Sequence, residues 1–133
     1  MKIVVSPNPY RDKQFKNARQ ACSILREAGA EVALCLPFDV DKTFEIPHDL
    51  RFQDIQKEIK TADMLICFGG DGTILHSSKI ATEHNLPILG VNIGTMGFIA
   101  ELEAGEIELL RKIPKGDYTV EERTMLDLSL IHI

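Results

Sequence analysis

A run of three glycines around one aspartate, Gly69-Gly70-Asp71-Gly72-Thr73, is the segment whose residue types and spacing best suit chemistry. It joins an apolar run to a segment of helical periodicity. Glycines let a ligand approach the backbone without a Cβ in the way, and the free N–H groups of a helix N-terminus suit a phosphate. The loop is not a Walker A motif, because no Lys-Ser/Thr pair follows, and not GxGxxG, because Leu75 takes the last glycine position. We therefore predict nucleotide or phosphate contacts, in a different geometry, from Gly69, Gly70, Gly72 and Thr73.

Asp71 is the charged residue of this loop, and two roles fit it. As a helix-capping carboxylate it would accept hydrogen bonds from backbone N–H groups. A carboxylate repels a phosphate, however, so a phosphate-binding loop gains nothing from it. A hydroxyl group or a magnesium ion is a better neighbour, as in kinase acceptor sites, where an aspartate takes the proton of the attacking hydroxyl. The residues alone leave capping and proton transfer open.

A second glycine-containing segment, Asn92-Ile93-Gly94-Thr95-Met96-Gly97-Phe98, follows the next apolar run in the same way. Its spacing fits either a ligand-binding loop or a tight turn before a buried phenylalanine. Open α/β sheets bind ligands at the carboxyl ends of their strands, which favours the first interpretation. We therefore predict that Asn92, Gly94 and Gly97 contribute to the same site as Asp71.

The elements that must position these loops alternate along the chain. Continuous apolar runs predict strands at 2–6, 32–36, 64–68 and 88–91, and such runs are typical of strands buried on both faces of a parallel sheet. Apolar residues at helical spacing predict helices that begin near Asp12, capped by it, and end at Gly29, and helices over 49–60, 73–83 and 104–113. The pattern predicts an α/β fold, a Rossmann-like open parallel sheet with flanking helices, and both glycine loops at one edge.

The end of the chain departs from this alternation. Residues 124–133 have the two-residue period of a strand, and the chain stops there without a turn or a polar tail. A lone apolar strand needs partners from the rest of the sequence or from residues past 133. We predict an α/β nucleotide-binding domain over 1–122, and in 123–133 the start of a crossover into a further domain that these residues do not include.

Composition restricts the classes of function. The 133 residues carry a net charge of −5, which argues against non-specific binding to nucleic acid or anionic membrane. Three cysteines in apolar runs, with no histidine at zinc-ligand spacing, indicate buried inert thiols and no metal site. No apolar stretch approaches the ~18 residues of a membrane helix, and the N-terminus does not read as a signal peptide. We expect a cytoplasmic protein with no membrane or nucleic-acid partner.

The two glycine motifs, with Glu101-Leu102 behind the second, resemble the N-terminal domain of the NAD kinases. The resemblance runs from the first strand to the end of the chain, and residues 123–126 look like the family's crossover into its second domain. The first motif discriminates weakly, since 6-phosphofructokinases and diacylglycerol-type lipid kinases carry similar loops. The second motif separates them, because the lipid kinases' Pro-x-Gly-Thr pattern leading into Asn-Asp does not occur here.

The resemblance implies transfer of the terminal phosphoryl group of ATP, or of polyphosphate, to the 2′-hydroxyl of the adenosine ribose of NAD, assisted by Mg²⁺ or another divalent metal. It makes Asp71 the proton acceptor, places Gly72 against the dinucleotide, and puts His76 where a basic side chain often lies near the nucleotide, although a lone helical histidine can equally be a surface residue. It also implies a homo-oligomer. Family members continue into a β-rich domain whose Asn-Glu or Asn-Asp pair grips the dinucleotide, so we expect negligible activity from these 133 residues alone. A lipid or sugar kinase of the same superfamily and a non-catalytic nucleotide-binding module are the alternatives.

Overall fold

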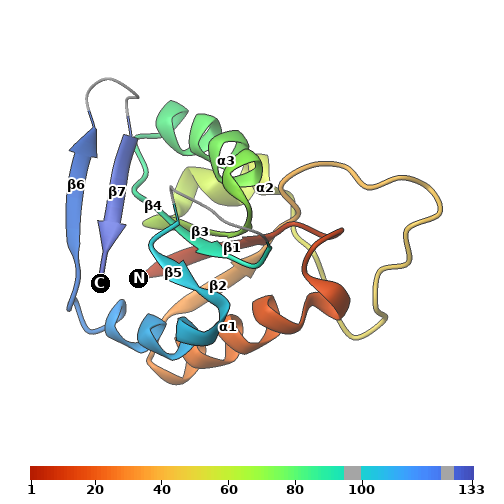
Figure 1. The fold of residues 1–133 in the computed structure, drawn as a ribbon, viewed down its shortest axis with the longest axis horizontal. Helices are drawn as coiled ribbons and strands as arrows, with labels where there is room; N and C mark the ends of the chain where they lie inside the picture. The colour runs from red at the N-terminus through yellow and green to blue at the C-terminus, as the bar shows by residue number, and fades with distance from the viewer. Residues whose placement is uncertain (95–99, 124–127) are drawn as a thin grey trace.

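Four neighbouring parallel strands form one side of the sheet in the computed structural model, which describes residues 1–94, 100–123 and 128–133. They are β1 (Lys2–Pro7), β2 (Glu31–Leu34), β3 (Met64–Gly69) and β4 (Ile88–Asn92), in the spatial order β2-β1-β3-β4 (Figure 1). The register pairs Val4 with Leu65 and Cys67 with Gly90. The parallel α/β sheet predicted from the apolar runs is therefore confirmed.

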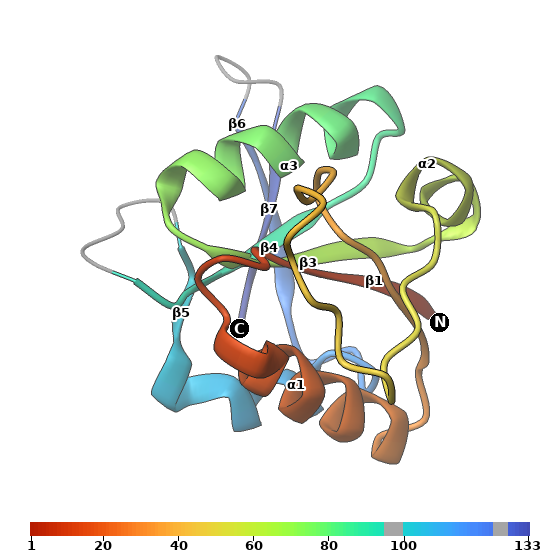
Figure 2. The same cartoon turned by 90° about the vertical axis from the view of Figure 1, so that its right-hand side faces the viewer.

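Side chains alternate between the two faces of this sheet, and each face has its own core. Val5 and Ile66 pack with α1 (Lys16–Glu27) and η3 (Ala104–Lys112), whereas Val4 and Leu65 pack with α2 (Ile55–Glu58) and α3 (Asp71–Glu83). Figure 2 shows the two helical layers on opposite sides of the strands. Since both faces are covered, the strands are apolar at most of their interior positions, which is the pattern the sequence shows.

The connection from β1 to α1 is held by Asp12, which is fully buried. Its carboxylate accepts hydrogen bonds from the backbone N–H groups of Asn17 and Ala18, at 3.0 and 2.9 Å. Asp12 thus caps α1 as predicted, although a short 3₁₀ turn, η1 (Lys13–Phe15), separates it from the helix. Gly29, with φ +100°, ends the helix in the left-handed conformation that glycine favours.

Two predicted helices differ from the observed ones. The helix predicted over 49–60 is confined to α2 and the 3₁₀ turn η2 (Ile59–Thr61), because Gln53 pairs with Cys35 as a parallel bridge and Asp54 caps α2 through the Gln56 N–H. The helix predicted over 104–113 is a 3₁₀ helix, η3. It still buries Ile107 and Leu110 against the sheet, so the predicted apolar face is right and the helix type is wrong.

The last residues join the same sheet. β6 (Thr119–Arg123) and β7 (Leu128–His132) form an antiparallel pair, and β7 runs parallel to β4, with Leu130 opposite Ile88. The short strand β5 (Leu102–Glu103) pairs with the carboxyl end of β4. Of the terminal strand predicted over 124–133, the described part is β7, whose partners come from this chain, and 124–127 lie outside the described residues. None of the described helices is long and apolar enough to cross a membrane.

Candidate active site

The two glycine loops leave the sheet side by side. Gly69 at the end of β3 is opposite Asn92 at the end of β4, and the Ile93 N–H donates to the Gly69 carbonyl at 3.3 Å. Because β3 and β4 are parallel neighbours, their carboxyl ends meet at one edge of the sheet. The sequence prediction that Asp71 and Asn92 share that edge is confirmed.

Gly69 is glycine for a steric reason. A Cβ at this position would lie 2.6 Å from Cβ and 2.7 Å from Oγ1 of Thr73, one helical turn further along the chain. Thr73 is itself fixed, because its Oγ1 accepts a hydrogen bond of 2.8 Å from Asn8 Nδ2. The first glycine and the threonine of the motif therefore set the angle at which β3 passes into α3.

Gly70, Asp71 and Gly72 form the part of the loop with open space in front of it. A Cβ at Gly70 or Gly72 would meet no atom within 4 Å, so the backbone there is accessible. Gly70 is the N-cap residue of α3, and Asp71 is its first helical residue and partly buried. The helix is thus capped at Gly70, and the Asp71 carboxylate adds a negative charge at the positive end of the helix dipole.

The second glycine loop, which begins at Asn92, is fixed by a contact with β5. Asn92 is 5% exposed. Its Nδ2 donates to Glu103 at 3.0 Å, and its Oδ1 accepts from the Gly94 N–H at 3.2 Å. The amide therefore orders the start of the loop. Gly97 lies outside the described residues, so its predicted ligand contact remains a prediction.

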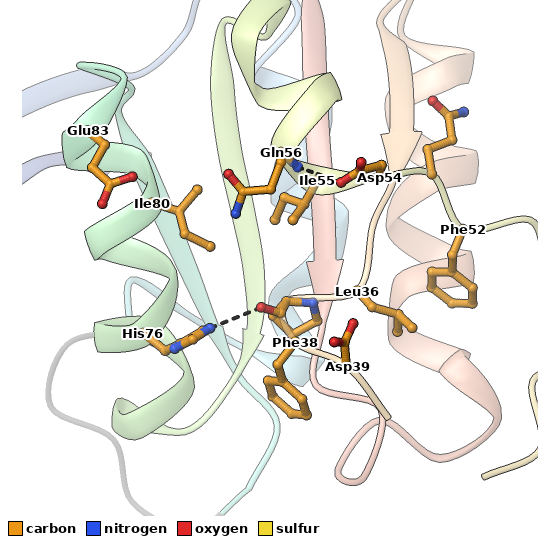
Figure 3. A pocket seen from close by; sticks show the side chains of 12 residues that line it. Leu36, Phe38, Asp39, Phe52, Asp54, Ile55, Gln56, His76, Ile80 and Glu83 are labelled. Carbon is orange, nitrogen blue, oxygen red and sulfur yellow. Dashed lines mark hydrogen bonds between the residues drawn. The ribbon is translucent and has the colours of Figure 1, made fainter. Parts of the chain in front are cut away.

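His76 points toward the segment after β2. Its Nε2 lies 3.0 Å from the Pro37 carbonyl oxygen, and its ring meets the Phe38 ring edge-on, with centroids 6.1 Å apart. Figure 3 shows His76 at the wall of a pocket of about 850 Å³ between α3 and this segment. Residues 69–73 and 92–94 do not line this pocket. These contacts give His76 a structural role, and its predicted nucleotide contact remains a prediction.

The carboxyl end of a third strand, β1, lies at the same edge, and its residues Asn8 and Arg11 were not predicted from the sequence. Asn8 joins Thr73 as described, and the Asn8 N–H donates to the Phe68 carbonyl at 2.8 Å. The guanidinium of Arg11 lies beside Gly94, with Nη1 2.9 Å from the place a Cβ would occupy there. In the sequence, the two prolines on either side of Asn8 indicate only that the first strand ends there. The rule that ligands bind beyond strand ends is the signal that could have singled it out.

The three cysteines lie outside this site, in the core. Burial raises the pKa of the Cys22 thiol to about 11, and burial together with nearby acidic groups raises that of Cys35 to about 12. Burial also raises the pKa of Cys67 to about 12. All three are buried free thiols, as predicted. In residues 1–94, 100–123 and 128–133, no group of three His, Cys, Asp or Glu side chains is placed to hold a metal ion.

Comparison with known proteins agrees with this arrangement. The family model described as the ATP-NAD kinase N-terminal domain matches residues 2–118. This range includes both glycine motifs and the four strands β1 to β4. The chain belongs to the NAD kinase family. The expected resemblance is thereby confirmed, and with it the α/β fold of the family's N-terminal domain.

Individual NAD kinases match the chain over most of its length. The enzyme of Bacteroides fragilis is 33% identical over 130 residues, which are 96% of this chain and 45% of that protein. The enzyme of Caldanaerobacter subterraneus is 34% identical over 131 residues, 98% of this chain and 45% of its own. That of Natranaerobius thermophilus is 44% identical over 79 residues, 59% of this chain. The chain spans less than half the length of these curated relatives.

Proposed function

We propose that the protein containing this chain is an NAD kinase, which transfers the terminal phosphoryl group of ATP, or of polyphosphate, to the 2′-hydroxyl of the adenosine ribose of NAD. The family membership supports this class of reaction. The observation that carries the assignment to these residues is the position of Asp71, on the first turn of α3 between two glycines with open space in front of them.

Asp71 would act as the proton acceptor in this reaction. The 2′-oxygen forms a bond to the terminal phosphorus, and the bond from that phosphorus to the bridging oxygen breaks, so that ADP leaves when ATP is the donor. The hydroxyl proton goes to the Asp71 carboxylate. Gly69, Gly70, Gly72 and Thr73 would bring backbone N–H groups to the substrates, and Asn92, Gly94, Gly97 and His76 would complete the binding surface.

A magnesium ion fits this site only as a partner of the substrate. Mg²⁺ is commonly held by one or two carboxylates together with substrate phosphates, and Asp71 is the one carboxylate in residues 69–73 and 92–94. When bound, the ion would neutralise charge on the phosphates. Together with this ion, ATP and NAD are the proposed small-molecule partners. A cytoplasmic location and a homo-oligomeric assembly belong to the same proposal.

The experiment is the substitution Asp71→Asn in the protein at its natural full length. The amide keeps the size of the side chain but cannot accept the proton, so kcat should fall by about 10²–10⁴ while the affinity for NAD changes only a few-fold. Asp117→Asn is the matched control, since Asp117 is exposed and lies in the turn between η3 and β6. Its kcat should stay close to that of the parent protein.

Two results would count against the proposal. If the parent protein forms no NADP from NAD with either donor, the assigned reaction is wrong. If the parent is active and a folded Asp71→Asn protein keeps more than about a third of its kcat, against the loss expected for a general base, the role of Asp71 is limited to the helix terminus. Thermal unfolding of each variant supplies the control for folding.

A further inference from the structure

The turn after β1 is a rigid third loop at the edge that carries the two glycine loops. The Asn8 carbonyl accepts hydrogen bonds from the N–H groups of Arg11 and Asp12, at 3.2 and 2.9 Å, and Asn8 Oδ1 accepts from the Tyr10 N–H at 3.0 Å. Asn8 is 9% exposed and Asp12 is fully buried. The backbone on both sides of Arg11 is thus fixed before any ligand arrives.

The Arg11 side chain reaches from this turn to Gly94, in the segment after β4. The turn follows β1, while Gly94, against which the guanidinium lies, follows β4. In the sheet order β3 separates these two strands, so β1 and β4 are two strand spacings, ~10 Å, apart. The turn after β1, the Gly69–Asp71 segment after β3 and Gly94 after β4 therefore follow three adjacent strands at one edge of the sheet.

The charges of the residues at this edge indicate a role for Arg11. Residues 69–73 and 92–94 contain a single charged side chain, the negative Asp71, so these two loop segments bring no cation to a phosphate. Arg11 is exposed, and no hydrogen bond or ion pair with the described residues occupies its guanidinium. We propose that Arg11 is a substrate-binding residue of this site, whose guanidinium binds a phosphate group of the nucleotide lying over Gly69–Asp71.

Arginine suits this role for a geometric reason. Its planar guanidinium donates two parallel hydrogen bonds to one phosphate, whereas a lysine ammonium acts as a point charge. A cation at the same edge of the sheet as Asp71 also offsets the repulsion between that carboxylate and the incoming phosphates. The inference rests on the proposed kinase function for the identity of the nucleotide. The phosphate it binds belongs either to the triphosphate of ATP or to the pyrophosphate of NAD.

The test compares Arg11→Gln, Arg11→Lys and the control Arg51→Gln in the protein at its natural full length. Arg51 is exposed and lies in the segment before α2, so its substitution removes the same charge elsewhere. Initial rates of NADP formation are measured with ATP varied at saturating NAD and with NAD varied at saturating ATP. Equilibrium binding of ATP and of NAD is measured by calorimetry without turnover.

Loss of a charge-assisted bidentate pair should raise KM and Kd about ten- to a hundred-fold for one substrate in Arg11→Gln. An effect on ATP assigns the phosphate to the donor, and an effect on NAD assigns it to the acceptor. Arg11→Lys should recover part of the loss, and Arg51→Gln should match the parent. If both Arg11 variants bind ATP and NAD as the Arg51 variant does, the inference is wrong. The calorimetry tests Arg11 even if no NADP forms, so failure of the proposed function is separately visible.

Discussion

Replacing Gly69 with alanine should destabilise the fold, whereas replacing the adjacent Gly70 with alanine should leave the fold stable and weaken nucleotide binding. At Gly69 the new Cβ would lie 2.6 Å from Thr73 Cβ, more than 1 Å inside ordinary contact distance. Thr73 cannot turn away freely, since its Cβ is attached to α3 and its Oγ1 is hydrogen-bonded to Asn8. Gly69→Ala must therefore shift backbone, at a cost of about 1–3 kcal/mol. For a chain of this length that lowers Tm by about 4–11 °C.

Gly70→Ala is the matched change on the open side of the loop, which we assign to the ligand. Its φ of −96° is accessible to alanine, and a Cβ there meets nothing within 4 Å, so stability should change by less than about 1 kcal/mol. The same methyl group would occupy the space in front of the loop and weaken nucleotide binding. Thermal unfolding and calorimetric titration of ATP and NAD on both variants measure the two effects. Equal stability of the two proteins would refute the steric argument, and unchanged nucleotide binding by Gly70→Ala would refute the assignment of the open side to a ligand.

Two further predictions concern residues away from the loops. The hydrogen bond to Glu101, together with a second one to Glu121, raises the pKa of His132 in the folded chain. Protonated His132 therefore stabilises the fold. This contribution is fully present below the pKa of histidine in the unfolded chain, about 6.5, and is lost as the pH rises through the folded pKa. The Tm of the parent should therefore exceed that of His132→Gln by more at pH 5.5 than at pH 9, and a pH-independent difference would contradict this. At pH 8 a thiol reagent should not label the cysteines of the folded chain, because burial and raised pKa values keep the thiols protonated and inaccessible. In denaturant the reagent should label all three, Cys22, Cys35 and Cys67.

Local patterns in the sequence predicted the central strands and the shared edge because both depend on short-range signals. A continuous apolar run such as Met64 to Phe68 indicates a strand covered on both faces, and the carboxyl ends of parallel strands meet at one edge. By contrast, β6 was missed. It is the last strand in the sheet order and has the sequence TVEER, and Val120 is 47% exposed. An edge strand exposed to water needs no apolar pattern, so its sequence does not distinguish it from a loop.

The candidate site was predicted only in part, for a related reason. Gly69 and Asp71 belong to one short motif, and a motif is visible without knowledge of the fold. Asn8 meets Thr73 across 65 positions of sequence, and Arg11 meets Gly94 across a strand that neither belongs to. Both contacts follow from the order in which the strands assemble, with β1 beside β3. That order depends on tertiary packing, which periodicity within a segment does not record.

Because β1, β3 and β4 are adjacent in the sheet but come from separate parts of the sequence, the edge they form exists only after two chain closures, of which the one between β1 and β3 is the longer. Val5 must meet Ile66, and the end of β3 must meet the end of β4, before Asn8, Gly69 and Gly94 come together. Contacts of such separation form late and slowly in folding. A nucleotide that binds this edge therefore binds the folded chain and not the unfolded one, and at a hundred times its Kd it would stabilise the whole sheet by about 2.7 kcal/mol. If a nucleotide binds there as proposed, its concentration would thereby affect the resistance of the chain to unfolding through these three strand ends.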